Sequence, residues 1–201
     1  SKIKDMLKAF YPVLYLTSFE YDRTKQKIEG IINVLRSEGK DVRIFNWNCV
    51  DGLRGLNGDK PQPVINKDGE EIVEPEEVLK YILNDKDVSK DVFVLEDFNN
   101  YIEEENVKYY IRSIAERARH TNTHVIILSA VYKLPVELEK YVTVLNIPLP
   151  DRFDMEKTLG VVERQCKINL SMEMRNRMVD AALGMTSMEA DLAFCLAAVK
   201  D

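Results

Sequence analysis

Short, largely apolar runs recur along the sequence, and each is bounded by polar or turn-forming residues. Runs of this length and character predict β-strands that are buried on both faces of a sheet. The predicted strands are residues 13–17, 42–46, 92–95, 124–129 and 142–146.

Amphipathic stretches separate these strands and predict helices. Gly39 provides a stop after the first stretch, and Pro75 opens the second in the first-turn position that proline favours. Because apolar strands alternate with helices, we expect an α/β fold with a parallel sheet covered on both faces. The helices predicted in this part of the chain are residues 20–38, 76–83 and 103–119.

The pattern changes after Pro148 and Pro150, where only helices are predicted. We therefore expect an α/β core over residues 1–150 and a small helical lid over residues 151–201. The last predicted helix runs almost to Asp201 without a stop signal, so we expect the natural chain to continue. The helices predicted in the lid are residues 151–166, 171–183 and 187–199.

A polar segment with several glycines and prolines follows the second predicted strand. Within it, Val64-Ile65 and Glu71-Ile72-Val73 flank the turn-forming sequence Lys67-Asp68-Gly69. This arrangement is typical of a β-hairpin. We therefore predict a hairpin-bearing insertion over residues 51–74.

Composition narrows the function classes. The 201 residues carry 28 Lys and Arg against 34 Asp and Glu, a net charge of −6, and 45% are hydrophobic. An acidic balance argues against a nucleic-acid partner, because phosphate contacts need clustered Lys and Arg. The basic stretch 112–119 is offset by acidic neighbours and is interpreted as a solvated helix face. No apolar run approaches the roughly 18–20 residues that span a bilayer, and no signal peptide is recognised, so we expect no membrane partner.

Cysteine and histidine usage points to a reducing compartment and away from metal binding. Cys49, Cys166 and Cys195 are odd in number, far apart and form no CxxC pair, so we expect a cytoplasmic protein with reduced thiols. The two histidines, His120 and His124, flank residues that indicate a helix end, so they would not share a helical face. We expect no metal site.

Five strands followed by three helices is also the plan of the AAA+ ATPases, a branch of the P-loop NTPase fold. Such enzymes carry GxxxxGK[S/T] after the first strand, because glycines let backbone N–H groups approach phosphate and the lysine reaches the outer phosphates. The segment from Thr17 to Lys25 contains no glycine. Thr17 and Glu20 instead predict a capping box, and Glu20 and Asp22 place carboxylates where a triphosphate would need positive charge. We interpret Thr17, Glu20 and Asp22 as residues that block the phosphate site.

Two further positions resemble nucleotide-site residues. Glu96 and Asp97 follow an apolar strand as a magnesium-binding Walker B pair would, but in reversed order, and acids that only solvate the strand end are the favoured interpretation. Ser129 ends the fourth predicted strand, where a polar sensor of the γ-phosphate would lie; the alternative is a surface serine that closes a strand. No serine lies in a GxSxG elbow, and we expect no catalytic residue in this chain.

Seven segments carry a family resemblance: residues 13–20, 46–53, 94–98, 125–130, 134–138, 144–151 and 181–186. Taken together, they resemble the N-terminal domain of a bacterial and plastid family of AAA-type ATPases, in which a degenerate ATPase-like domain precedes an active one. The resemblance implies a five-stranded parallel sheet of order 5-1-4-3-2, a lid from about Asp151, and a C-terminal partner domain that binds ATP and Mg²⁺. Residues 134–142 contain no arginine that could act as a finger for a neighbouring subunit. Arg152 is either an interface arginine or a first-turn surface residue.

Three hypotheses follow. The leading one is a non-catalytic module, without cofactor, that positions or regulates an ATPase domain or makes protomer contacts in an assembly. The second is an adaptor that binds another protein through the insertion. The third is a weak ATPase that uses Glu96 and Asp97 with Mg²⁺.

Overall fold

The computed structural model describes residues 2–56, 58, 60–84, 90–117, 121 and 123–200, without the side chains of Lys90 and Lys200. His120, considered above as a metal ligand, and residues 118–119, predicted as the end of a helix, lie outside the described part. The chain forms two compact units, Ser1–Ile147 and Pro148–Asp201. Each unit is described by itself.

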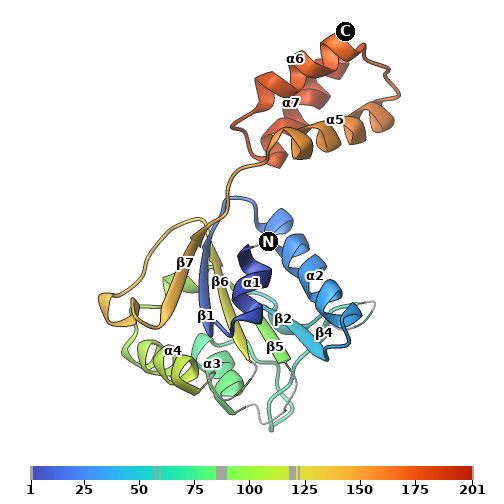
Figure 1. Ribbon diagram of the computed structural model, residues 1–201. Helices are drawn as coiled ribbons and strands as arrows, with labels where there is room; N and C mark the ends of the chain where they lie inside the picture. The colour runs from blue at the N-terminus through green and yellow to red at the C-terminus, as the bar shows by residue number, and fades with distance from the viewer. Residues whose placement is uncertain are drawn as a thin grey trace. The chain divides into compact units, whose positions relative to one another are not determined.

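The first unit is built around one mixed sheet (Figure 1). Its order is β4-β3-β2-β5-β6-β1-β7. The strands β2, β5, β6, β1 and β7 are parallel to one another, whereas β3 pairs antiparallel with both β2 and β4. The strands are β1 (Val13–Thr17), β2 (Val42–Asn48), β3 (Gly52–Gly55), β4 (Gln62–Pro63), β5 (Lys90–Glu96), β6 (His124–Ser129) and β7 (Val142–Asn146).

The prediction of a five-stranded parallel sheet is wrong, because the sheet has seven strands and its full order differs from the predicted one. The five predicted strands are present and lie in the order β7-β1-β6-β5-β2, and the two additional strands extend the sheet beyond β2. The extension begins with a tight reversal after β2, where Asn48 Oδ1 accepts hydrogen bonds from the N–H groups of Val50 and Asp51 at 2.9 and 2.8 Å. Gly52 then has φ +69°, and a Cβ there would lie 2.6 Å from the carbonyl oxygen of Ile72. Only glycine fits this close approach without strain.

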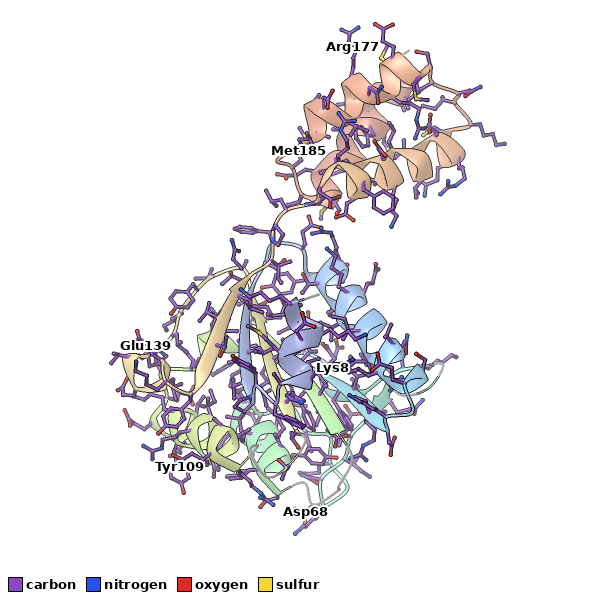
Figure 2. All side chains as sticks on the ribbon, in the orientation of Figure 1. Lys8, Asp68, Tyr109, Glu139, Arg177 and Met185 are labelled. Atoms are coloured by element: carbon purple, nitrogen blue, oxygen red, sulfur yellow. The ribbon has the colours of Figure 1, made fainter. Side chains whose placement is uncertain are left out.

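The predicted hairpin within the insertion forms a single antiparallel bridge, Ile65 to Glu71, rather than two full strands. Its turn is organised by Asn66, whose Oδ1 accepts from the N–H groups of Asp68 and Glu70, both at 3.0 Å. Figure 2 shows Asp68 at the tip of this turn. The sequence signal for a reversal was therefore correct, and the extent of strand pairing was overestimated.

Helices cover both faces of the sheet (Figure 1). α1 (Lys2–Lys8) and α2 (Tyr21–Ser37) bury apolar side chains such as Ile28 and Ile32 against one face. α3 (Pro75–Asn84) and α4 (Glu105–Arg117) pack on the other face, whose core contains Trp47 and Phe93. Two short 3-10 helices, η1 (Phe98–Asn100) and η2 (Val136–Leu138), belong to the connections.

The second unit contains only helices, α5 (Arg152–Cys166), α6 (Met172–Ala182) and α7 (Ser187–Lys200). Its own apolar core includes Leu159 and Phe194. Thr186 and Glu189 form a reciprocal capping box at the start of α7. Arg152 forms an ion pair with Asp180 and lies 3.6 Å from Glu156, so its first-turn position is held by contacts within this unit.

Candidate functional site

The polar residues singled out in the sequence gather at the carboxyl ends of β1, β5 and β6, which we call the carboxyl edge. The strand register explains this, because Thr17 pairs with Ser129 and Glu96 pairs with Leu128. In open α/β sheets, ligands bind outside the carboxyl ends of the parallel strands. The carboxyl edge is therefore the place where a nucleotide site has to be tested.

Glu96 ends β5 and is held by residues from two other elements. Lys25 of α2 places its Nζ 3.2 Å from both carboxylate oxygens, and Asn46 of β2 donates a hydrogen bond from Nδ2 to Oε1 at 2.6 Å. The Glu96 side chain is only 13% exposed. Burial alone would lower the pKa of Lys25, but the charges of Glu96 and Asp22 and the hydrogen bonds to them together outweigh burial and raise this pKa. Lys25 is therefore a cation at neutral pH.

Asp97 follows in the left-handed region, with φ 52°. The hydroxyl of Tyr21, in the first turn of α2, donates a hydrogen bond to Asp97 Oδ1 and accepts one from the Ala130 N–H at 2.9 Å. Burial, followed by the hydrogen bond to Asp97, raises the pKa of Tyr21 to about 12. The phenol is thus neutral at physiological pH and joins α2 to the ends of β5 and β6.

Ser129 is 1% exposed, so the alternative of a surface serine is wrong. Its Oγ accepts a hydrogen bond from the Val131 N–H at 3.1 Å. The hydroxyl of Tyr15 fixes the same connection, because it donates to Val131 O at 2.6 Å and accepts from the Lys133 N–H at 3.2 Å. These contacts hold the segment that follows β6, and the sensor-like assignment of Ser129 stays a prediction.

The predicted capping role of Thr17 is wrong. Thr17 still belongs to β1, and its hydroxyl donates to Asn146 Oδ1 of the neighbouring β7 at 3.1 Å. Ser18 organises the turn instead, since its Oγ accepts from the Glu20 N–H at 3.0 Å and forms a hydrogen bond with the Thr24 hydroxyl at 3.1 Å. Helix α2 therefore begins one residue after Glu20.

The two predicted blocking carboxylates differ in their surroundings. Glu20 occupies the N-cap position of α2 and is 7% exposed. The Asp22 side chain is 90% exposed and lies 3.4 Å from Lys25. Both acids are at the positive end of the α2 helix dipole, which favours negative charge there.

Sequence reasoning missed Tyr21, Lys25 and Asn46 as members of this site. Their spacing was one available signal. Tyr21 and Lys25 are four residues apart, so they lie on one face of the helix and can contact the same neighbouring element. The sequence alone could not identify Glu96 and Asp97 as their partners, because the strand order brings together residues that are 71 positions apart. Among the described residues no cluster of His, Cys, Asp and Glu is arranged to hold a metal ion, and no helix is long and apolar enough to cross a membrane.

The α/β core and the position of this edge define the class of protein as AAA+ ATPase-like. The chain belongs to the family described as SpoVK-like AAA ATPase, N-terminal domain, whose sequence model matches residues 1–147. This confirms the resemblance to an N-terminal domain of AAA-type ATPases.

Relatives and solved structures agree with this placement. The chain is 25% identical over 181 residues to the uncharacterised AAA domain-containing protein ycf46 of Pyropia yezoensis, covering 90% of this chain and 34% of that protein. It is 23% identical over 189 residues to ycf46 of Guillardia theta, covering 92% of this chain and 35% of that protein. The chain thus spans about a third of the length of these relatives.

Two solved structures share the fold at low sequence identity. C. elegans PCH-2 is similar with a TM-score of 0.64 at 12% identity, over 100% of this chain and 62% of that one. The FIGL-1 AAA domain in complex with ADP is similar with a TM-score of 0.58 at 11% identity, over 94% of this chain and 61% of that one. At these identities the likeness shows the fold alone.

Proposed function

We propose that this chain is a non-catalytic AAA+-like module that positions or regulates the ATPase domain of a longer parent protein. The observation that carries the proposal is the double closure of the carboxyl edge by α2. Tyr21 hydrogen-bonds Asp97, and Lys25 forms an ion pair with Glu96. Both acids that could serve Mg²⁺ are therefore already engaged by side chains of the same chain.

The residues at this edge do not fit a bound magnesium nucleotide. Phosphate binding at a helix N-terminus depends on free backbone N–H groups and nearby positive charge. Here Glu20 is the N-cap residue of α2 and Asp22 lies in its first turn, and the nearest lysine, Lys25, is paired with Glu96. A triphosphate would have to break this ion pair and approach two carboxylates, and both are electrostatically unfavourable. We derive no chemical step through ATP at this site.

The expected partner is an ATPase domain in the remaining part of the parent. The matched relatives are AAA domain-containing proteins of about three times this chain's matched length. A domain that keeps the AAA+ fold without using its nucleotide edge can still present the surfaces by which such domains pack. ATP and Mg²⁺ would then bind to the partner domain. The proposed compartment is the cytoplasm, where free thiols such as Cys49 stay reduced.

Phosphate release from ATP tests the proposal against the weak-ATPase alternative. The purified chain with MgATP should release phosphate no faster than buffer alone. Hydrolysis that disappears in Asp97→Ala and persists in the matched surface variant Asp41→Ala would overturn the proposal and favour an enzyme. Asp41 is the suitable control because it is exposed and precedes the first residue of β2, at the end of the strand opposite to the carboxyl edge.

A second candidate function, a protein-binding adaptor, is favoured by the exposure of large apolar side chains around the insertion. Val50 is 83% exposed and Ile65 is 57% exposed. The double variant Val50→Ser, Ile65→Ser changes only two exposed side chains and should leave the fold intact. Loss of a partner captured by the unaltered chain would support an adaptor, and unchanged capture would contradict it.

A further inference from the structure

The two edges of the sheet differ in a way that points to a partner strand. One edge is β4, which consists of Gln62 and Pro63 and is preceded by Pro61. Short edges that carry proline resist pairing with another chain, because proline has no N–H to donate. This edge is therefore poorly suited to pairing with another strand, and we call it the blunt edge.

The other edge, β7, has none of these protections. It is five residues long, Val-Thr-Val-Leu-Asn, and contains no proline and no charged residue. Within the described residues β7 pairs with β1 alone, so its outer side has no strand beside it (Figure 1). An uncharged edge of this length is a template for another strand, and soluble proteins normally guard such edges.

The backbone groups that face outward can be assigned. Ile147 donates its N–H to Thr17 O at 2.9 Å, so Ile147 and, by alternation, Leu145 and Thr143 direct their backbone groups toward β1. Val142, Val144 and Asn146 then direct their N–H and C=O groups away from the sheet. These three residues are symmetric about Val144, which is the arrangement that antiparallel pairing of two identical strands requires.

Side chains beside this edge are also suited to a second strand. Val144 is 40% exposed and pairs in register with Tyr15 of β1. The ring of Tyr132, 54% exposed, packs edge-on against Tyr15 with a centroid distance of 5.6 Å. Apolar surface therefore flanks the open edge on the face that carries Val144, and cross-strand contacts between β-branched and aromatic side chains stabilise sheets.

From these observations we infer that two copies of this chain pair through β7, antiparallel about a two-fold axis at Val144. Val144 exchanges both backbone hydrogen bonds with Val144 of the second copy, and Val142 pairs with Asn146 of the second copy. Each chain has one open and one blunt edge, so the assembly closes as a dimer and does not grow into a fibre. The inference is independent of whether the carboxyl edge binds a nucleotide.

The test is the mass of the chain in solution, measured by sedimentation equilibrium between about 5 and 500 µM, the range in which small interfaces dissociate. The unaltered chain should shift from monomer toward dimer. Val144→Lys should remain monomeric over the same range, because two ammonium groups would meet at the axis. The control Ile65→Lys, also at an exposed apolar position, should dimerise like the unaltered chain.

Hydrogen exchange keeps the inference testable if Val144→Lys fails to fold. In the unaltered chain, the amides of Val142, Val144 and Asn146 should exchange about tenfold more slowly at the highest concentration than at the lowest. The amide of Gln62 at the blunt edge should not change. A monomer at all concentrations with unchanged exchange, a Val144→Lys variant that still dimerises, or growth beyond a dimer would each overturn the inference.

Discussion

The Lys25 ammonium group of α2 lies 3.2 Å from each carboxylate oxygen of Glu96, the residue that ends β5. One turn earlier on the same helix, Tyr21 hydrogen-bonds Asp97. Helix α2 thus uses two residues on one face to engage two consecutive acids at the carboxyl edge. These two contacts form only in the folded protein, so we expect the stability of the protein to depend on them.

Removal of the Lys25 charge should destabilise the protein. Lys25→Met leaves the largely buried Glu96 with Asn46 as its remaining described partner, and we expect a loss of about 1–3 kcal/mol in the free energy of unfolding. Urea unfolding measures this loss. The matched control Lys27→Met, on the exposed face of the same helix, should change stability by less than about 0.5 kcal/mol. Equal effects of the two variants would contradict a specific role for Lys25.

The Tyr21 phenol should give a signature at alkaline pH. Its pKa is raised from 10.0 to about 12, so the folded state holds this proton more tightly than the unfolded state. The contribution of Tyr21 to stability is therefore fully present below pH 10 and is lost as the pH rises toward 12.

Tyr21→Phe provides the comparison. The difference in unfolding free energy between the unaltered chain and Tyr21→Phe should be constant from pH 7 to about 10 and shrink above it. Ultraviolet difference spectra of the two proteins should locate the missing phenol titration near pH 12. If the phenol titration that is lost in Tyr21→Phe lies near pH 10.0 instead, the result would contradict a buried, hydrogen-bonded Tyr21.

An acid-side signature is expected from Glu38, which joins α1 to the end of α2. Hydrogen bonds from Lys8 and Lys4 lower its pKa from 4.5 to about 2. Because the pKa is lower in the folded state, this contribution is present above pH 4.5 and is lost as the pH falls toward 2. In urea unfolding at a series of pH values, Glu38→Gln should flatten the decline of stability below pH 4.5 and weaken its salt dependence. An unchanged acid slope would contradict the assignment.

The ion pair between Arg43 and Asp91 crosses from β2 to β5 in direct register. Arg43 contacts both carboxylate oxygens, at 2.9 and 2.5 Å, and the Asp91 side chain is 1% exposed. Arg43→Met should therefore cost about 3 kcal/mol or more. The control Arg54→Met breaks a pair with the half-exposed Glu71 and should cost less than about 1 kcal/mol. Chemical unfolding of both variants measures the two losses in unfolding free energy. Equal losses would contradict the expected effect of burial.

The apolar pattern was a good guide to strands that are buried on both faces. The predicted bounds 13–17, 124–129 and 142–146 match β1, β6 and β7, because continuous apolar runs have few other stable environments. The pattern missed β3, whose sequence Gly-Leu-Arg-Gly has no strand character of its own. That strand exists because Leu53 is buried at 1% exposure beside Trp47, a tertiary contact.

The local motif at Thr17 and Glu20 failed for a related reason. A Ser or Thr three residues before Glu caps a helix only if the helix starts there. Thr17 instead remains in β1, where it pairs with Asn146 of β7. The acids at positions 96 and 97 could be predicted to lie at a strand end. Their partners on α2 depend on how a helix packs on a parallel sheet, and that information is not local.

Calorimetric titration with MgATP and MgADP at millimolar concentration tests the central claim most directly, because the proposal holds that α2 closes the carboxyl edge to nucleotide. We expect no heat beyond dilution for the unaltered chain, and none for the control Lys27→Met. Saturable, stoichiometric binding that is lost in Asp97→Ala would contradict a module that works without nucleotide.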